Sequence, residues 1–530
     1  MIRQHVRLAC VIVGPVGFGL LSYAQAPEKP FRKPLPVVDV VRTHAGAIQG
    51  PPPNAAGIRI YKGVAFAMPP VGDRRWRAPA PLEIWEGVRP ATEFSADCMQ
   101  AAPADGHRAS EDCLYLNIWT GAKTIAERRP VLVWIHGGGF SAGSGRDPRI
   151  NGENLAKRGI VVVTLNYRVG ALGFLAHPEL TQESHSRTSG NYGLLDQLAA
   201  LAWVQRNIMM FGGDPANVTL GGNSAGALCV NMLVASPLAK NHFRRVIAES
   251  GAAVSSFSSA YPQPLKASEQ AGIEFMKAAG AGSLAALRQI PAVDLLKARG
   301  PNRMSIDGHV IPADPHEWFS SGKQNDVPIL TGWNRDDVAG GGTTTGATAF
   351  KQQVTTRYGA HAEAVLKVFP ADTDEQAAKS AAALSRDVLF AWQGYTWIRL
   401  QERTGKAAAY TYFFTRVPPD TPQQMARGVF HGSESPYALD NLDKFKRPYS
   451  EIDRKLSAVM SSYWINYMRS GNPNGNGLPE WPQFSTRTDQ VMELGDTISL
   501  RPTPFKDEFA ALDEVFERMR TSSRIAAIRP

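Results

Sequence analysis

The chain has 530 residues and is basic, with 57 Lys and Arg against 48 Asp and Glu and a formal net charge of +9. Hydrophobic residues make up 43% of the chain and charged residues 20%, which is typical of a globular protein and excludes a disordered or fibrous one. Lys and Arg are scattered rather than clustered, so the charge argues against nucleic-acid binding, while a bias toward anionic substrates stays open.

The first 24 residues have the pattern of a secretory signal peptide. Arg3 and Arg7 precede an apolar stretch at 8–23, and small residues follow it. The stretch is shorter than the roughly 20 apolar residues of a membrane span, so cleavage after Ala24 is favoured over an uncleaved anchor. Cleavage after Ala26 is the second possibility, although Pro27 disfavours it.

The signal predicts a secreted or periplasmic protein without stable membrane insertion once the signal is removed. The proline-rich residues 25–36 form a leader, and residues 37–525 are expected to form one folded domain.

Apolar runs of strand length alternate with helix-length stretches along this domain. The alternating pattern of residues 110–119 predicts a strand. Leucines at helical spacing in 191–210 predict a helix. Continuous apolar runs, typical of strands buried on both faces, lie at 131–135, 160–165, 245–248, 327–330 and 408–413. The alternation predicts an α/β fold with a doubly wound, mostly parallel sheet flanked by helices.

Two further segments are predicted to be irregular. The Gly/Thr-rich residues 340–349 are expected to form a mobile surface loop. Within the segment 464–481, residues 471–477 are expected to be a chain of turns between helical stretches.

The four cysteines predict one disulfide and no metal site. Cys10 leaves with the signal, and in an oxidising compartment Cys98 and Cys113 can bridge a short loop. Cys229 is then expected to be a buried small hydrophobe rather than a reactive thiol. No Cys/His spacing suggests a metal ligand set, and no cofactor is predicted.

Ser224 is the predicted nucleophile. It lies in a G-x-S-x-G pattern with Gly222 and Gly226, between an apolar strand and an expected helix, where the next amide, Ala225 N–H, can face an oxyanion. Ser141 fits the same pattern, but no helical stretch follows it. The context therefore favours Ser224.

A serine nucleophile needs a histidine base and an orienting carboxylate, expected downstream in the order Ser, acid, His. His431 is the best placed of the later histidines, in a Gly- and Pro-containing loop after the 408–413 strand. Asp336 and Asp337 both follow the strand at 327–330, and sequence spacing does not separate them.

A glycine run closes the buried strand at 131–135. His136-Gly-Gly-Gly-Phe140 lets two backbone N–H groups turn inward, which with Ala225 N–H predicts an oxyanion hole.

Together these motifs resemble the type B carboxylesterase and cholinesterase-like family of α/β-hydrolases, from residue 63 to 481. The matching stretches are 63–72, 111–117, 136–140, 211–215, 224–226 and 464–481, with the His431 segment. The resemblance implies a single large α/β-hydrolase domain, Ser224 as nucleophile and His431 as base. It implies oxyanion-hole amides from Gly138, Gly139 and Ala225, the Cys98–Cys113 disulfide, and a structural Arg75–Glu111 pair.

The chain departs from the family pattern at two positions near the expected site. Asn223 stands where the family has Glu before the nucleophile. The family's acid is a Glu that aligns with Asp337, which makes Asp337 the acid, and this shorter carboxylate must lie nearer to His431. The loop between Cys98 and Cys113 also lacks the choline-binding tryptophan of similar cholinesterases, which argues against a choline-ester specialist.

The sequence thus predicts a serine carboxylesterase that acts on small-molecule esters through a Ser-His-Asp triad and an acyl-enzyme. One alternative is a specialist for bulky or polycarboxylic, anionic esters. The other is a cholinesterase-like binding protein without catalysis. The oligomeric state is left open.

Overall fold

The computed structural model describes residues 35–101, 105–338 and 346–528, with side chains to residue 521. The expected signal, residues 25–34 of the leader and residues 339–345 of the expected surface loop lie outside the described residues.

The main sheet of the described chain has ten strands. They are β3 (Arg59–Ala65), β7 (Tyr115–Thr120), β8 (Arg129–Ile135), β9 (Val161–Leu165), β10 (Gly213–Asn223), β11 (Arg245–Glu249), β14 (Ile329–Asn334), β15 (Ala409–Phe414), β16 (Gln490–Leu494) and β17 (Ile498–Pro502). Their spatial order is β17-β16-β15-β14-β11-β10-β8-β9-β7-β3. The seven strands from β16 to β9 in this order are parallel, and only β17, β7 and β3 pair antiparallel. The predicted mostly parallel sheet is confirmed.

Smaller sheets flank it. They are β1 (Val40–Arg42) with β2 (Ala47–Gln49) and β4 (Val88–Pro90), β5 (Asp97–Cys98) with β6 (Ala109–Ser110), and β12 (Gln263–Pro264) with β13 (Ser305–Ile306).

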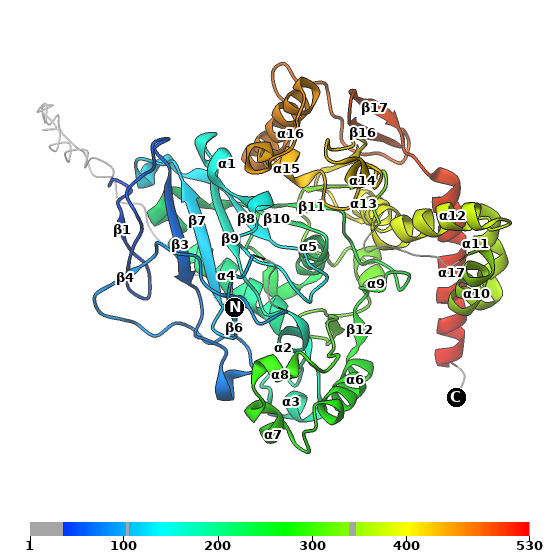
Figure 1. Ribbon diagram of the computed structural model, residues 1–530, viewed down its shortest axis with the longest axis horizontal. Helices are drawn as coiled ribbons and strands as arrows, with labels where there is room; N and C mark the ends of the chain where they lie inside the picture. The colour runs from blue at the N-terminus through cyan, green and yellow to red at the C-terminus, as the bar shows by residue number, and fades with distance from the viewer. Residues whose placement is uncertain (1–34, 102–104, 339–345, 529–530) are drawn as a thin grey trace, which may run out of the picture.

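Helices cover both faces of the main sheet (Figure 1). The α-helices of the described chain are α1 (Glu153–Lys157), α2 (Gly170–Phe174), α3 (Pro178–Glu183), α4 (Tyr192–Asn207), α5 (Ala225–Ala235), α6 (Leu265–Ala278), α7 (Leu284–Gln289), α8 (Ala292–Leu295), α9 (Pro315–Ser320), α10 (Ala347–Tyr358), α11 (Ala362–Val368), α12 (Asp374–Arg386), α13 (Trp392–Thr404), α14 (Pro422–Met425), α15 (Ser435–Ala438), α16 (Glu451–Ser470) and α17 (Lys506–Ile528). Of these, α10, α11, α12 and α17 lie together at the right of Figure 1, to one side of the sheet. None of the helices in the described ranges is both long and apolar enough to cross a bilayer.

The continuous apolar runs are buried on both faces, as predicted. Successive side chains of a strand point to opposite faces. In β8, Val131 and Val133 therefore join a core that includes residues of α4 and α5, whereas Leu132 and Trp134 join a second core that includes residues of α16.

Two sequence predictions need correction. The expected loop at 340–349 ends early, because Ala347 starts α10, whose Phe350 and Val354 are buried on one face. Residues 471–477 are irregular and follow a helix, as predicted, because α16 ends at Ser470 and is capped by Gly471 with φ 82°. The helix expected after them is wrong, since the next regular element is the strand β16. Trp481 anchors the irregular stretch through edge contacts with Tyr410 and Tyr463.

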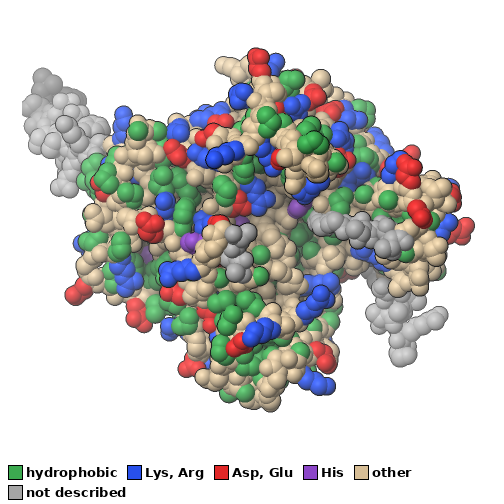
Figure 2. Space-filling model, in the orientation of Figure 1, with side chains coloured by type: hydrophobic (Ala, Val, Ile, Leu, Met, Phe, Trp, Pro, Cys, Tyr) green, Lys and Arg blue, Asp and Glu red, His purple; other side chains and the backbone are tan. Residues whose placement is uncertain are grey.

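Charged side chains of both signs are interspersed on the face shown in Figure 2. That distribution agrees with the scattered charge of the sequence.

Candidate active site

Ser224 occupies a strained turn between β10 and α5, with φ 59° and ψ −127°. A non-glycine residue at positive φ costs of order 1–3 kcal/mol, so the surrounding structure must hold it there. A Cβ at Gly222 would lie 2.6 Å from the Gly226 backbone, and one at Gly226 would lie 2.1 Å from Ile135 O. Both glycines are required for the close approach of strand and helix. Ala225 begins α5, where the first N–H groups have no intrahelical acceptor.

The glycine run after β8 lies against this turn. A Cβ at Gly137 would come within 3.0 Å of the Ser224 Cβ. Gly138 has φ 114°, and a Cβ there would be 2.1 Å from Ala142 O, so only glycine fits. Gly139 and Ala225 border, with Ser224, a cavity of about 280 Å³.

His431 and Asp337 meet beside the cavity. His431 Nδ1 donates a hydrogen bond of 2.6 Å to Asp337 Oδ1. Asp337 is fully buried, and its other oxygen accepts from Asn334 N at 3.0 Å. His431 follows β15 and Asp337 follows β14, and these two strands are neighbours in the sheet. Both residues therefore leave the carboxyl end of the same sheet as Ser224.

Asp336 contacts the backbone of the histidine loop and Arg335, not the imidazole. Its side chain is 41% exposed and pairs with Arg335 at 3.1 Å. Asp336 Oδ2 also accepts from Val429 N at 2.8 Å, which fastens the loop that leads to His431. The structure thus distinguishes two carboxylates that sequence spacing left open and that only the family resemblance separated, because of the two only Asp337 contacts the imidazole.

The environment of His431 favours a charged imidazole. Burial lowers its pKa, but the charge of Asp337 and its hydrogen bond raise the pKa more, and the net shift is upward. His431 Nε2 is buried and has no hydrogen-bond partner among the described residues, Ser224 Oγ included. Catalytic hydrogen bonds are often long in proteins without a bound substrate.

Phe390 covers the imidazole on one face. The two rings stack with centroids 4.2 Å apart and an interplanar angle of 17°. Phe390 lies in a π-helical turn at Asp387–Ala391 and also borders the cavity that holds Ser224. Sequence reasoning missed Phe390, since nothing in a helical stretch marks a local change of helical pitch.

Two buried glutamates form the wall beneath Ser224. Glu434 Oε1 accepts from Asn223 Nδ2 at 3.0 Å and Ser250 Oγ at 3.1 Å, and Oε2 accepts from Asn334 Nδ2 at 2.5 Å. Asn223 therefore supplies a donor to Glu434 where a glutamate would add another carboxylate. Burial and the nearby Asp337 raise the Glu434 pKa.

Glu249 is the second glutamate of this wall. It accepts from Ser435 Oγ at 2.6 Å and Trp464 Nε1 at 3.0 Å, and burial with the nearby Glu434 raises its pKa to about 8. Sequence reasoning missed both glutamates. The available signals were a Glu directly after the apolar run of β11 and a Glu three residues after His431.

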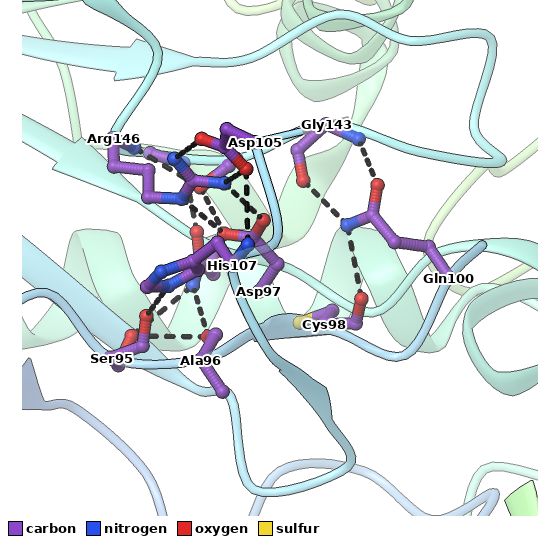
Figure 3. Close-up of polar contacts among 12 residues, drawn as sticks. Ser95, Ala96, Asp97, Cys98, Gln100, Asp105, His107, Gly143 and Arg146 are labelled. Carbon is purple, nitrogen blue, oxygen red and sulfur yellow. Dashed lines mark hydrogen bonds and ion pairs between the residues drawn. The ribbon is translucent and has the colours of Figure 1, made fainter. Parts of the chain in front are cut away.

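The disulfide loop supports the loop that follows the glycine run. Cys98 and Cys113 are bonded, as predicted. Gln100 exchanges two hydrogen bonds of 2.9 Å with the Gly143 backbone. Figure 3 shows Arg146 reaching the carboxylates of Asp97 and Asp105 from the same side, at 3.1 Å and 2.5 Å.

Other predicted residues are placed as follows. Arg75 and Glu111 form a bidentate pair with two contacts of 2.6 Å, as expected. Cys229 is buried, and burial raises its pKa to about 12, so it remains a thiol. Burial lowers the pKa of His136 to about 4, which keeps that ring neutral. In the part of the chain that the structure describes, no group of three or more His, Cys, Asp and Glu side chains is arranged to hold a metal ion.

Comparisons with known proteins identify the family of the chain. A model described as the carboxylesterase family matches residues 37–511. Fumonisin B1 esterase of Sphingopyxis macrogoltabida is 35% identical over 485 residues, covering 87% of each chain. Para-nitrobenzyl esterase of Bacillus subtilis (strain 168) is 33% identical over 497 residues, covering 88% of this chain and 96% of that one.

A solved PNB esterase structure matches with a TM-score of 0.78 and 31% identity, over 89% of this chain and 99% of the other. The sheet order, the strained serine turn and these relatives lead to one conclusion. The chain belongs to the carboxylesterase family of α/β-hydrolases and is a carboxylic ester hydrolase.

Proposed function

We propose that the enzyme hydrolyses carboxylic esters with Ser224 as nucleophile, His431 as general base and Asp337 as the orienting acid. The observation that carries the proposal is the 2.6 Å hydrogen bond from His431 Nδ1 to a fully buried Asp337. It leaves Nε2, the other ring nitrogen, without a protein partner beside the cavity that Ser224 lines.

The first half-reaction forms an acyl-enzyme. His431 Nε2 takes the proton of the Ser224 hydroxyl as its oxygen attacks the ester carbonyl. The amides of Gly138, Gly139 and Ala225 donate to the oxyanion of the tetrahedral intermediate. The C–O bond to the alcohol then breaks, and His431 gives its proton to the departing alcohol oxygen.

In the second half-reaction water replaces the alcohol. His431 takes a proton from water as the water oxygen attacks the acyl carbon. The bond from the acyl carbon to Ser224 Oγ then breaks, His431 returns the proton to Ser224 Oγ, and the carboxylic acid leaves. The buried Asp337 holds the imidazole in one tautomer and stabilises its protonated form throughout.

The short acid is accommodated by the position of the histidine loop. Asn334 Nδ2 donates to Phe430 O at 3.0 Å, and Asp336 holds Val429 N. These contacts bring the loop to the end of β14, so that the aspartate reaches His431 without the extra methylene of a glutamate.

Export is part of the proposal. Residues 1–24 act as a cleaved signal and 25–36 as a leader ahead of the domain, so the mature enzyme is secreted or periplasmic. The Cys98–Cys113 disulfide supports this, since such bonds persist in oxidising compartments.

The test is hydrolysis of 4-nitrophenyl butyrate, followed by mass spectrometry after treatment with an organophosphate. We expect Ser224→Ala to lower kcat/KM by about 10⁴-fold or more and to abolish the adduct. Ser141→Ala is the matched control, because Ser141 has the same sequence pattern but is not itself at positive φ and is not directly followed by a helix. That variant should still carry the adduct on Ser224. An active Ser224→Ala enzyme, or an adduct on Ser141, would overturn the assignment.

A further inference from the structure

The cavity beside Ser224 is lined by both apolar and polar side chains. Leu228, Leu389 and Phe390 are among the apolar ones. Ser259, Asn302 and Arg303 lie among the polar residues, and Arg303 is the only charged residue among the described ones that line this cavity. A cation at the rim of an otherwise uncharged cavity can select substrates by charge.

The Arg303 guanidinium has no partner among the described residues. Neither a carboxylate nor a carbonyl lies within hydrogen-bond or ion-pair distance of it there. Arginines elsewhere near the site are paired, such as Arg146 with Asp97 and Arg168 with Asp196. Arg303 therefore keeps its five N–H donors available, in the planar arrangement that fits a carboxylate.

The position of Arg303 assigns it to one part of the substrate. The adjacent Asn302 donates to Ser141 Oγ at 2.7 Å and to Gly139 O at 3.3 Å, which fastens this segment to the glycine loop. In the proposed mechanism the alcohol must lie next to His431, which protonates it, and the carbonyl oxygen lies at the glycine loop. The cavity is lined by Gly139 and Ala225 of the proposed oxyanion hole, and His431 is not among its described lining residues. We therefore assign the cavity that Arg303 lines to the acyl group.

We propose that Arg303 binds a carboxylate on the acyl part of the substrate. The enzyme then prefers esters of dicarboxylic or polycarboxylic acids that keep a second, ionised carboxylate while the ester bond is cleaved. This inference rests on the proposed function, because the acyl side is defined by the roles of Ser224 and His431.

The exposure of Arg303 sets the expected size of the preference for anionic acyl groups. Arg303 is exposed, so water and salt screen its charge, and the gain is smaller than for a buried ion pair. We expect the anionic acyl group to raise kcat/KM by roughly tenfold at low ionic strength, and this gain to shrink as salt is added.

The experiment compares two substrates with the same leaving group and chain length, the 4-nitrophenyl monoester of adipic acid and 4-nitrophenyl hexanoate. The readout is the ratio of their kcat/KM values. Arg303→Gln should lower the ratio roughly tenfold and remove its salt dependence. Arg303→Glu should lower it further and favour the ester of 6-aminohexanoic acid instead.

Arg299→Gln is the matched control. Arg299 is an exposed arginine of the same segment that does not line the cavity, and its loss changes the net charge equally. We expect its ratio to equal that of the wild type. An unchanged ratio in Arg303→Gln, or an equal fall in Arg299→Gln, would overturn the inference.

Two further arms separate the possible failures. With 4-carboxyphenyl hexanoate the carboxylate lies on the alcohol part, and a loss confined to this substrate in Arg303→Gln would contradict the acyl-side assignment. Ser224→Ala should lose activity toward every substrate. If Ser224→Ala remains active, the proposed function fails whatever the ratio; if only the ratio is unaffected by Arg303→Gln, this inference alone fails.

Discussion

The wall beneath Ser224 and the rim of its cavity are built in opposite ways. In the wall, the carboxyl groups of Glu434 and Glu249 are fully buried and accept hydrogen bonds from donors on several elements. At the rim, Arg303 is exposed and unpaired among the described residues. The hydrogen-bonded wall keeps the residues around Ser224 in a fixed geometry, which the hydrolysis of every ester requires. The solvated Arg303 can affect only those substrates that carry a group able to pair with it.

The largest expected difference in kcat is between variants of two adjacent residues, Asp337 and Asp336. Asp337→Asn should lower kcat by about 10³-fold or more, because an amide cannot stabilise the protonated imidazole or enforce its tautomer. Asp336→Asn should lower kcat by less than about tenfold, since the Asp336 side chain bonds the backbone of the histidine loop and not the imidazole. Steady-state kinetics of both variants with 4-nitrophenyl butyrate provides the measurement. A larger loss in Asp336→Asn would reassign the acid.

A smaller effect on stability should distinguish the wall from the rim. Glu434→Gln places an amide among three donors, so at least one of them loses its acceptor, and we expect the free energy of unfolding to fall by about 2 kcal/mol. Arg303→Gln should change it by less than about 0.5 kcal/mol. Denaturant unfolding of both variants measures this, and equal losses would contradict the contrast.

The smallest expected effect is a shift of the acid limb of the pH–rate profile. The pKa of His431 is raised above its ordinary value of 6.5, and only neutral imidazole accepts the serine proton. Activity should therefore be lost as pH falls through a value above 6.5. In Asp337→Asn the raising charge is gone while burial remains, so the limb of the residual activity should move down by about one pH unit or more. Profiles of kcat/KM between about pH 5 and about pH 9 test this, and an unmoved limb would argue against Asp337 as the partner.

Local patterns predicted the parts of the site that lie within one segment. The strand, glycines and helix around Ser224 and the glycine run at 136–140 needed only neighbouring residues. Spacing alone could not choose between Asp336 and Asp337. The family resemblance implied Asp337, and the physical reason, the pairing of β14 with β15 that brings Asp337 to His431, is visible only in the structure. The roles of Phe390 and Glu434 also depend on contacts between segments far apart in the sequence. Arg303 belongs to no sequence motif, and only the structure shows that it lines the cavity beside Ser224.

We propose that Ser224 and His431 act as one catalytic unit, and a double-mutant comparison tests this most directly. The measurement is kcat/KM for 4-nitrophenyl butyrate in Ser224→Ala, His431→Ala and the double variant. Groups that work in the same step lose their effect together, so the double variant should be no less active, within about threefold, than the worse single variant. Losses that multiply would show that the two residues act independently and would contradict the account.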